Sequence, residues 1–219
     1  LSNEHGKKPA EIQIPIKPIY ALLDEAVASR GQSTAIDFLG RQWSYQQLGE
    51  LVDKAAAGFR ALGVKRDVRV GLHLPNTPYY IICYFAILKA GGTVVNFNPL
   101  YVERELAQQI KDSDTSIMVT MDLGALYSKL SPLLGKGSLK KLVVCKMTQI
   151  LPPAKSLLFK LFKRKDLAKL AQDARIIGFE KLLTLGTVQS PAKIDPKTEI
   201  AVLQYTGGTT GVPKGAVLT

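Results

Sequence analysis

Short apolar stretches alternate with amphipathic helical stretches along most of the chain, and this alternation limits the folds that are open to it. Apolar runs typical of strands occupy residues 34–38, 41–43, 68–74, 93–97, 116–120, 142–145 and 200–204. Apolar residues at helical spacing occupy residues 18–30, 45–62, 78–90, 103–112, 123–134 and 156–165. Apolar strands alternating with helices are typical of parallel sheets. The pattern therefore predicts an α/β fold, a mostly parallel sheet with helices on both faces.

Local signals support several of these boundaries. Ser44 followed by Gln47 at the third helical position is a capping box, so a helix should begin at residue 45. Residues 34–38 and 41–43 surround Gly40 and are expected to form a hairpin. The helix at 78–90 carries three tyrosines, which we expect to pack in the core rather than stack on a ligand. They are Tyr79, Tyr80 and Tyr84.

Residues 205–215 follow the last expected strand and read Tyr-Thr-Gly-Gly-Thr-Thr-Gly-Val-Pro-Lys-Gly. Glycines allow tight turns and close approach to a ligand, and consecutive backbone N–H groups in such a loop can form an anion nest. Threonine hydroxyls can donate to phosphate oxygens, and a lysine adds positive charge. The stretch therefore predicts a phosphate loop. Its candidate ligand-binding residues are Thr206, Gly207, Gly208, Thr209, Thr210, Gly211 and Lys214.

This loop is not a Walker A motif, which requires Gly-Lys-Ser/Thr after four intervening residues. Here Lys214 follows Pro213 and precedes Gly215. The plain alternative is a strand that ends in a glycine-rich turn beside a solvated lysine. Because the glycines, hydroxyls and lysine all suit one type of ligand, the pattern favours polyphosphate.

The loop resembles the phosphate-binding loop of the adenylate-forming (AMP-binding) enzymes, which include acyl-CoA synthetases, luciferases and peptide-synthetase adenylation domains. It departs from the common form at Gly207, where serine is usual. Residues 88–101, Leu-Lys-Ala-Gly-Gly-Thr-Val-Val-Asn-Phe-Asn-Pro-Leu-Tyr, resemble an early structural motif of the same family. Its ending and the form of residues 204–211 resemble the bacterial long-chain fatty acyl-CoA synthetases (ligases). The resemblance covers about residues 16–219, and residues 1–15 are expected to be a flexible arm.

The resemblance implies a two-step reaction that uses ATP, Mg²⁺ and coenzyme A. A fatty acid carboxylate attacks the α-phosphate of ATP, and the coenzyme A thiol then displaces AMP. Thr206 and the residues through Gly211 would wrap the β- and γ-phosphates, and Lys214 would be the catalytic residue that neutralises the pyrophosphate. Two alternatives stay open: another adenylate-forming ligase with an aromatic or amino acid substrate, and a non-catalytic membrane or interaction module.

Enzymes of this family are more than twice as long as the 219 residues present here. The resemblance therefore implies an incomplete N-terminal part of the AMP-binding domain, which we expect to be inactive alone. Strands without partners at the edge of such a part favour self-association, for example as a homodimer.

Positive charge is concentrated in one part of the chain. The net charge is +11, and residues 136–169 carry ten Lys or Arg against one acid, Asp166. Within a basic insertion at about 146–170, the helix at 156–165 has apolar residues on one side, namely Leu157, Leu158, Leu161 and Phe162. It either lies on the core as an ordinary surface helix or docks on anionic lipid headgroups. The lipid contacts would come from Lys155, Lys160, Lys163, Arg164 and Lys165.

Other classes of function have little support. The basic segment carries no recognisable nucleic-acid-binding motif, so no nucleic acid partner is expected. His5 and His73 lack the spacing of metal ligands, and no metal site is assigned. Cys83 and Cys145 are expected to be buried thiols in a reducing compartment. With no apolar run of 18 residues and no visible signal peptide, we expect a cytoplasmic enzyme, peripheral on the cytoplasmic face of the inner membrane.

Overall fold

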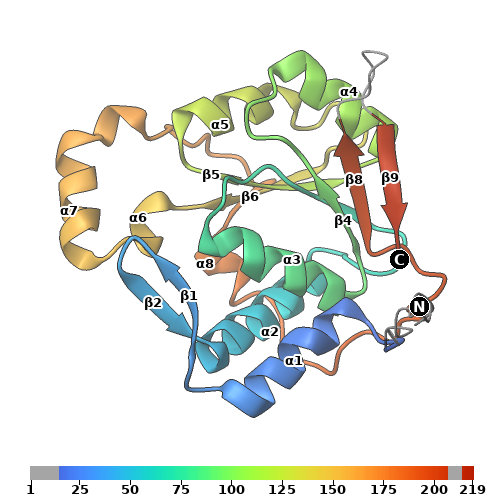
Figure 1. Ribbon diagram of the computed structural model, residues 1–219. Coiled ribbons are helices and arrows are strands. Elements are labelled where there is room, and N and C mark those ends of the chain that lie inside the picture. The colour runs from blue at the N-terminus through green and yellow to red at the C-terminus, as the bar shows by residue number, and fades with distance from the viewer. Residues whose placement is uncertain (1–14, 207–213) are drawn as a thin grey trace, which may run out of the picture.

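A computed structural model of the protein describes residues 15–206 and 214–219, and Figure 1 shows its α/β architecture. The main sheet has seven strands in the order β7-β6-β5-β3-β4-β8-β9. The strands are β3 Arg69–Leu72, β4 Thr93–Asn96, β5 Ile117–Met121, β6 Lys141–Cys145, β7 Ile176–Gly178, β8 Val202–Thr206 and β9 Lys214–Leu218. All neighbours are parallel except β8 and β9, which are antiparallel. The predicted mostly parallel sheet is confirmed.

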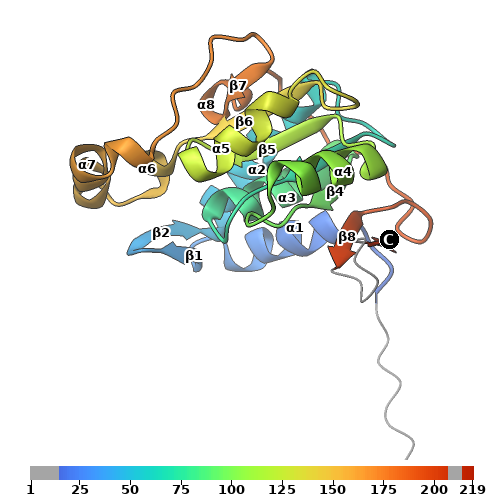
Figure 2. The ribbon, with the colours of Figure 1, turned by 90° about the horizontal axis from the view of Figure 1, so that it is seen from above.

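Helices cover both faces of this sheet, as predicted, and Figure 2 shows the two layers from above. One face packs against α1 Ile19–Arg30, α2 Tyr45–Ala61, α3 Pro78–Ala90 and α8 Phe179–Leu182. The other packs against α4 Glu103–Ser113 and α5 Gly124–Leu130. Successive strand residues enter opposite cores: Val94 belongs to the first cluster and Val95 to the second. This is the period of two that a strand buried on both faces requires.

The first two strands form a separate hairpin. β1 Thr34–Phe38 pairs antiparallel with β2 Arg41–Ser44, which confirms the predicted hairpin. Ser44 then caps α2: its Oγ accepts from the backbone N–H of Gln47 at 3.2 Å, and Gln47 Oε1 accepts from the Ser44 N–H at 3.0 Å. The capping box is confirmed, and it sets the start of the helix that packs most extensively on α3.

Lys89 is a nearly buried cation that joins three helices. Its Nζ lies 2.6 Å from Asp24 of α1 and 2.7 Å from Asp53 of α2. Burial by itself would lower the pKa of Lys89, but the hydrogen bonds and charges of the two carboxylates outweigh it and raise that pKa. The lysine in the 88–101 motif therefore holds the scaffold together.

Some boundaries differ from the sequence-based expectation. The helix expected at 123–134 ends at Leu130 and continues as a 3₁₀ turn, Ser131–Leu133, because Pro132 lacks an N–H and cannot continue an α-helix. The strand expected at 200–204 begins two residues later. The short elements β7, α8 and α6 (Met147–Ile150) had no sequence signal of their own. Except for Pro15, the expected flexible arm lies outside the described residues.

The amphipathic helix is present as α7, Pro153–Phe162. The interpretation that its apolar residues lie on the core is wrong: none of the residues of α7, all of which the structure describes, is buried. Among the described residues, no helix combines the length and the apolar character needed to cross a membrane. Cys83 and Cys145 are free and buried, as expected.

β9 forms one edge of the main sheet, and all five of its residues are exposed. An edge strand of this kind presents unpaired backbone groups. The expected exposed edge is confirmed, whereas self-association through it stays a prediction.

Candidate active site

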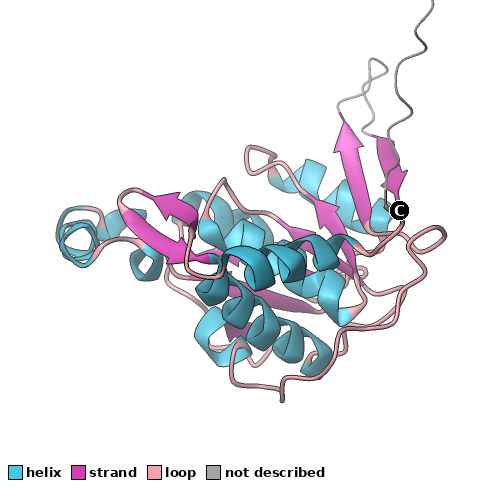
Figure 3. Ribbon diagram, turned by 60° about the horizontal axis from the view of Figure 1, so that its bottom comes forward, coloured by secondary structure: helices cyan, strands magenta, loops and turns pink. Residues whose placement is uncertain are grey.

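The hairpin of β8 and β9 holds together the two ends of the predicted phosphate loop. Thr206 is the last residue of β8, Lys214 is the first of β9, and the two are directly paired in the antiparallel register. In Figure 3 these strands lie side by side at one end of the molecule. Directly opposed residues project from the same face of a sheet, so the Thr206 hydroxyl and the Lys214 ammonium share a face. The five candidate residues between them lie outside the described residues: Gly207, Gly208, Thr209, Thr210 and Gly211.

Tyr205 fixes the strand immediately before the loop. Its hydroxyl donates to Asp112 of α4, and burial together with that carboxylate raises the pKa of Tyr205, so the phenol stays protonated. Gly215 is paired with Tyr205, and a Cβ added at Gly215 would lie 3.1 Å from the tyrosine ring. The last glycine of the motif therefore lets the ring lie close to the backbone of β9.

The loop begins at the carboxyl edge of the parallel strands. β3 connects onward to β4 on one side and its neighbour β5 connects onward to β6 on the other, so the direction of winding reverses between β3 and β5. Ligands of open α/β sheets bind outside the carboxyl ends of the strands at such a reversal. Thr206 ends β8 at this same carboxyl edge, on the far side of β4 from the switch point between β3 and β5.

A cavity of about 370 Å³ opens at the same edge. It is lined by residues that follow β3 and β4 and by the end of β8, among them Asn76, Tyr80, Asn96, Asn98, Gln204 and Tyr205. None of its described lining residues carries a formal charge. A second cavity of about 360 Å³ shares Tyr80, Asn96 and Gln204 but is otherwise largely apolar. Both cavities suit the uncharged parts of a ligand better than its phosphates.

A chain of hydrogen bonds joins the residues that the two cavities share. Tyr80 Oη donates to Asn96 Oδ1 at 2.9 Å, and Asn96 Nδ2 donates to Gln204 Oε1 at 2.6 Å. Asn96 and Gln204 are paired on adjacent parallel strands, which explains their contact. Burial raises the pKa of Tyr80, so its hydroxyl remains a donor. The chain fixes the orientation of both amides near the end of β8.

Gln109 of α4 adds an acceptor at this cavity. Its Nε2 donates to the backbone carbonyl of Asn96 at 2.8 Å, whereas its buried Oε1 has no hydrogen-bond partner among the described residues. A buried carbonyl oxygen without a partner is costly. It is therefore a candidate acceptor for a donor of the ligand or of the loop.

Sequence reasoning missed this polar chain. The core interpretation is correct for Tyr79, which is buried, while Tyr80 and Tyr84 are partly buried, pack against the core and line the second cavity. In the sequence, Asn96 stands out only as part of the 88–101 motif. The available signal was a polar residue at the end of an apolar strand, at Asn96 and again at Gln204.

His73 also follows a strand end, directly after β3, but it is a core residue. Its side chain is fully buried, its Nδ1 lies 3.5 Å from Thr120 Oγ1, and its Nε2 has no partner among the described residues. Burial, and secondarily the charge of Lys129, lowers the pKa of His73 to about 4. The imidazole is therefore neutral at physiological pH.

This burial predicts an acid-sensitive fold. Between pH 6.5 and pH 4 the unfolded chain binds a proton at His73 that the folded chain does not, so the free energy of unfolding falls as the pH falls through this window. The free energy of unfolding should fall between pH 7 and pH 5 in the parent. In His73→Leu we expect this fall to be smaller by about 2 kcal/mol. Urea unfolding at both pH values measures this difference. Equal losses in the two proteins would contradict the buried neutral imidazole.

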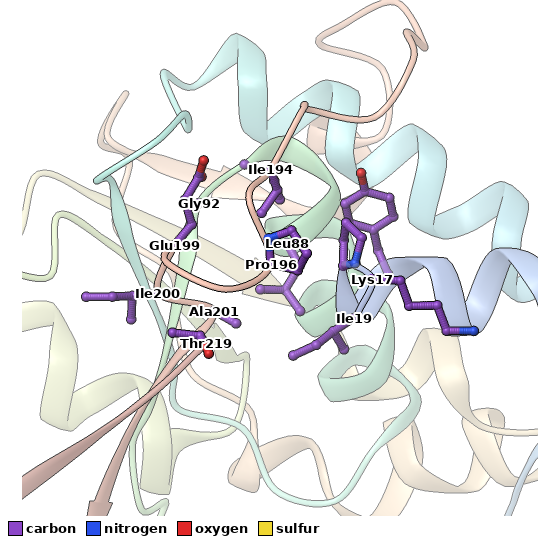
Figure 4. A pocket seen from close by; sticks show the side chains of 13 residues that line it. Lys17, Ile19, Leu88, Gly92, Ile194, Pro196, Glu199, Ile200, Ala201 and Thr219 are labelled. Carbon is purple, nitrogen blue, oxygen red and sulfur yellow. The ribbon is translucent and has the colours of Figure 1, made fainter. Parts of the chain in front are cut away.

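A different, small cavity lies at the opposite edge of the sheet, and Figure 4 shows its lining. It encloses about 50 Å³ beside Gly92 and Ala201, which directly precede β4 and β8. Its position at the amino ends of the strands separates it from Thr206 and Lys214. Its size does not suit a nucleotide.

A family model and several curated proteins match this chain. The family model described as "AMP-binding enzyme" matches residues 23–219. The chain is 34% identical over 222 residues to a long-chain-fatty-acid–CoA ligase of Bacillus subtilis, covering 96% of this chain and 38% of that protein. It is also 34% identical over 224 residues to the enzyme of that name from Escherichia coli O157:H7, covering 98% of this chain and 39% of that protein.

A solved structure shares the fold. The crystal structure of a long-chain-fatty-acid–CoA ligase from Archaeoglobus fulgidus superimposes with a TM-score of 0.75 at 22% identity, covering 99% of this chain and 39% of that one. The chain thus spans less than two-fifths of the length of these relatives.

Proposed function

The chain belongs to the AMP-binding enzyme family, and from this membership we propose that the protein is an AMP-forming long-chain fatty acid–CoA ligase. One observation carries the proposal: the Thr206–Lys214 pair holds the ends of the motif loop at the carboxyl edge of the sheet, beside an uncharged cavity. The 34% identity to two fatty acid–CoA ligases favours a fatty acid over an aromatic or amino acid substrate.

In the proposed reaction, the charged phosphates of ATP and the uncharged parts of the ligands bind to different residues. The loop N–H groups and the hydroxyl of Thr206 bind the β- and γ-phosphates of ATP, and Lys214 neutralises the pyrophosphate that leaves when the carboxylate attacks the α-phosphate. The amide chain beneath the loop keeps the end of β8 rigid, and a fixed geometry is what an in-line displacement requires. Coenzyme A then accepts the acyl group and AMP is released.

We also propose that Mg²⁺ enters with ATP, held by phosphate oxygens. Among the described residues no group of three His, Cys, Asp or Glu could hold a metal ion, so this part of the chain offers no protein cage for it. We propose a cytoplasmic location, at the inner face of the membrane, because the proposed reaction uses ATP and coenzyme A.

The test is ATP-dependent thioester formation by the purified full-length protein. It is incubated with coenzyme A and ATP together with one acid from a panel of long-chain and medium-chain fatty acids, coumarate and amino acids. Acyl-CoA and AMP are measured together by mass spectrometry. Acyl-CoA from fatty acids alone is the expected result. Thioester or adenylate only from coumarate or an amino acid would move the protein to another branch, and no adenylate from any acid would reject the proposal.

A further inference from the structure

Helix α7 exposes its most apolar side. Leu157, Leu158, Leu161 and Phe162 are 59%, 52%, 66% and 73% exposed, and none belongs to either core cluster. Residues four apart lie on one side of a helix, so Leu157 with Leu161 and Leu158 with Phe162 form one continuous stripe. An exposed apolar stripe of this kind marks a surface that another phase or molecule covers.

The opposite side of α7 holds the helix to the body. Ser156 and Phe159 are partly buried, and Ser156 Oγ donates to the backbone carbonyl of Thr148 at 2.7 Å. Lys155 Nζ donates to the backbone carbonyl of Leu39, in the turn of the β1–β2 hairpin, at 2.8 Å. These contacts fix the rotation of the helix, so the outward direction of the stripe is a property of the fold.

Leu39 extends the same surface. It lies beside α7 through the bond to Lys155, has a positive φ of 56°, and is 51% exposed. In Figures 1 and 2, α7 stands at the end of the molecule far from β8 and β9. The surface is therefore remote from the candidate active site.

The charge around the stripe is almost entirely positive. Residues 153–169 contain six Lys or Arg and a single acid, Asp166, which pairs with Lys163 at 3.6 Å. Lys160, Arg164 and Lys165 are exposed and have no ion pair among the described residues. Uniform positive charge around an apolar stripe matches a layer of lipid phosphates above acyl chains.

We propose that α7 and the turn at Leu39 form a docking surface for a membrane that contains anionic phospholipids. The apolar stripe enters the boundary between headgroups and acyl chains, and Lys160, Arg164 and Lys165 contact lipid phosphates. The long stems of the lysines allow their ammonium groups to reach the headgroup layer while the stripe is inserted. The proposal goes beyond the ligase activity and does not require it.

The experiment is co-sedimentation of the purified protein with vesicles. One set contains phosphatidylcholine alone and the other phosphatidylcholine mixed with phosphatidylglycerol, each at low and at high salt. We expect binding to the anionic vesicles at low salt, and loss of that binding at high salt because the charges are screened. Equal binding to both vesicle types, or to neither, would overturn the proposal.

Two sets of variants locate the surface. One variant replaces three of the four stripe residues, as Leu157→Gln, Leu161→Gln and Phe162→Gln. Its control carries Leu22→Gln and Val188→Gln, at other exposed apolar positions. Lys160→Gln, Arg164→Gln and Lys165→Gln together remove three charges, and Lys136→Gln, Lys140→Gln and Lys193→Gln is the control with the same charge loss. We expect each α7 variant to bind the anionic vesicles roughly 100-fold more weakly than the parent. The charge control should weaken binding less, because it lowers only the overall charge of the protein.

Two further measurements distinguish loss of lipid binding from misfolding and from self-association. All substituted side chains are exposed, so unfolding midpoints should match the parent and exclude misfolding. Analytical ultracentrifugation tests whether a second copy covers the stripe instead. A dimer that dissociates in the stripe variant, with no vesicle binding by the parent, would overturn the proposal, as would α7 variants that bind like the parent.

Discussion

Replacing Lys214 with alanine is expected to slow adenylate formation by about 100-fold or more while changing AMP binding little. Lys214 begins β9 directly opposite Thr206, with its exposed side chain on the same face as the hydroxyl. In the proposed reaction its charge meets the pyrophosphate, which carries more charge as the bond to the α-phosphate breaks. AMP has no β- or γ-phosphate, so the lysine has little to contribute to its binding.

This expectation is measured in the full-length protein, by single-turnover adenylation with ATP and by equilibrium binding of AMP to the same variant. Lys197→Ala is a matched control, because Lys197 is an exposed lysine in the loop near the opposite edge of the sheet. Parallel losses in adenylation and AMP binding would contradict the role at the pyrophosphate. An unchanged rate would remove Lys214 from the site.

Replacing Gly58 with alanine is expected to destabilise the fold by about 4 kcal/mol. Gly58 lies inside α2, and a Cβ there would stand 2.1 Å from the backbone oxygen of Leu182 and 2.8 Å from its Cγ. The clash is with the backbone of α8, so no side-chain rotation relieves it and the two elements must separate. The resulting gap would open the core that both helices share.

Gly49→Ala on the same helix is the control. Its Cβ would lie 2.9 Å from Val27 Cγ2, a side-chain atom, and both substitutions gain the same helix propensity of roughly 1 kcal/mol. We therefore expect Gly49→Ala to change the free energy of unfolding by about 1 kcal/mol or less, as measured by urea unfolding. Similar losses in the two variants would show that contact with α8 is not what keeps position 58 free of a side chain.

Predictions from sequence succeeded where neighbouring residues decide the structure. The capping box at Ser44, the hairpin around Gly40 and the apolar strands follow from contacts within a few residues, and all are present. The end of α5 differed because Pro132 interrupts a pattern that apolar spacing alone would continue. The boundaries of short elements such as β7 and α8 carried too few residues for a periodic signal.

In the candidate site too, the sequence predicts some residues and only the structure reveals the others. The chemistry of Thr206 and Lys214 could be named from the sequence because the loop motif is continuous, and the structure adds that they are register partners. The Tyr80–Asn96–Gln204 chain could not be named, because Gln204 meets Asn96 only after β8 returns to lie beside β4. The same applies to His73, whose pKa depends on burial by segments distant in the chain.

The sequence by itself determined the α/β class and the capping box at Ser44, since these depend on residue type and local spacing, and it predicts the phosphate loop on the same basis. Only the tertiary structure decided the position of Thr206 and Lys214 in paired register, the cavity at the carboxyl edge of the sheet and the outward direction of the α7 stripe. An amphipathic pattern shows that a helix has an apolar side but not what covers that side. Which surfaces are covered depends on packing between segments that the chain brings together only when it folds.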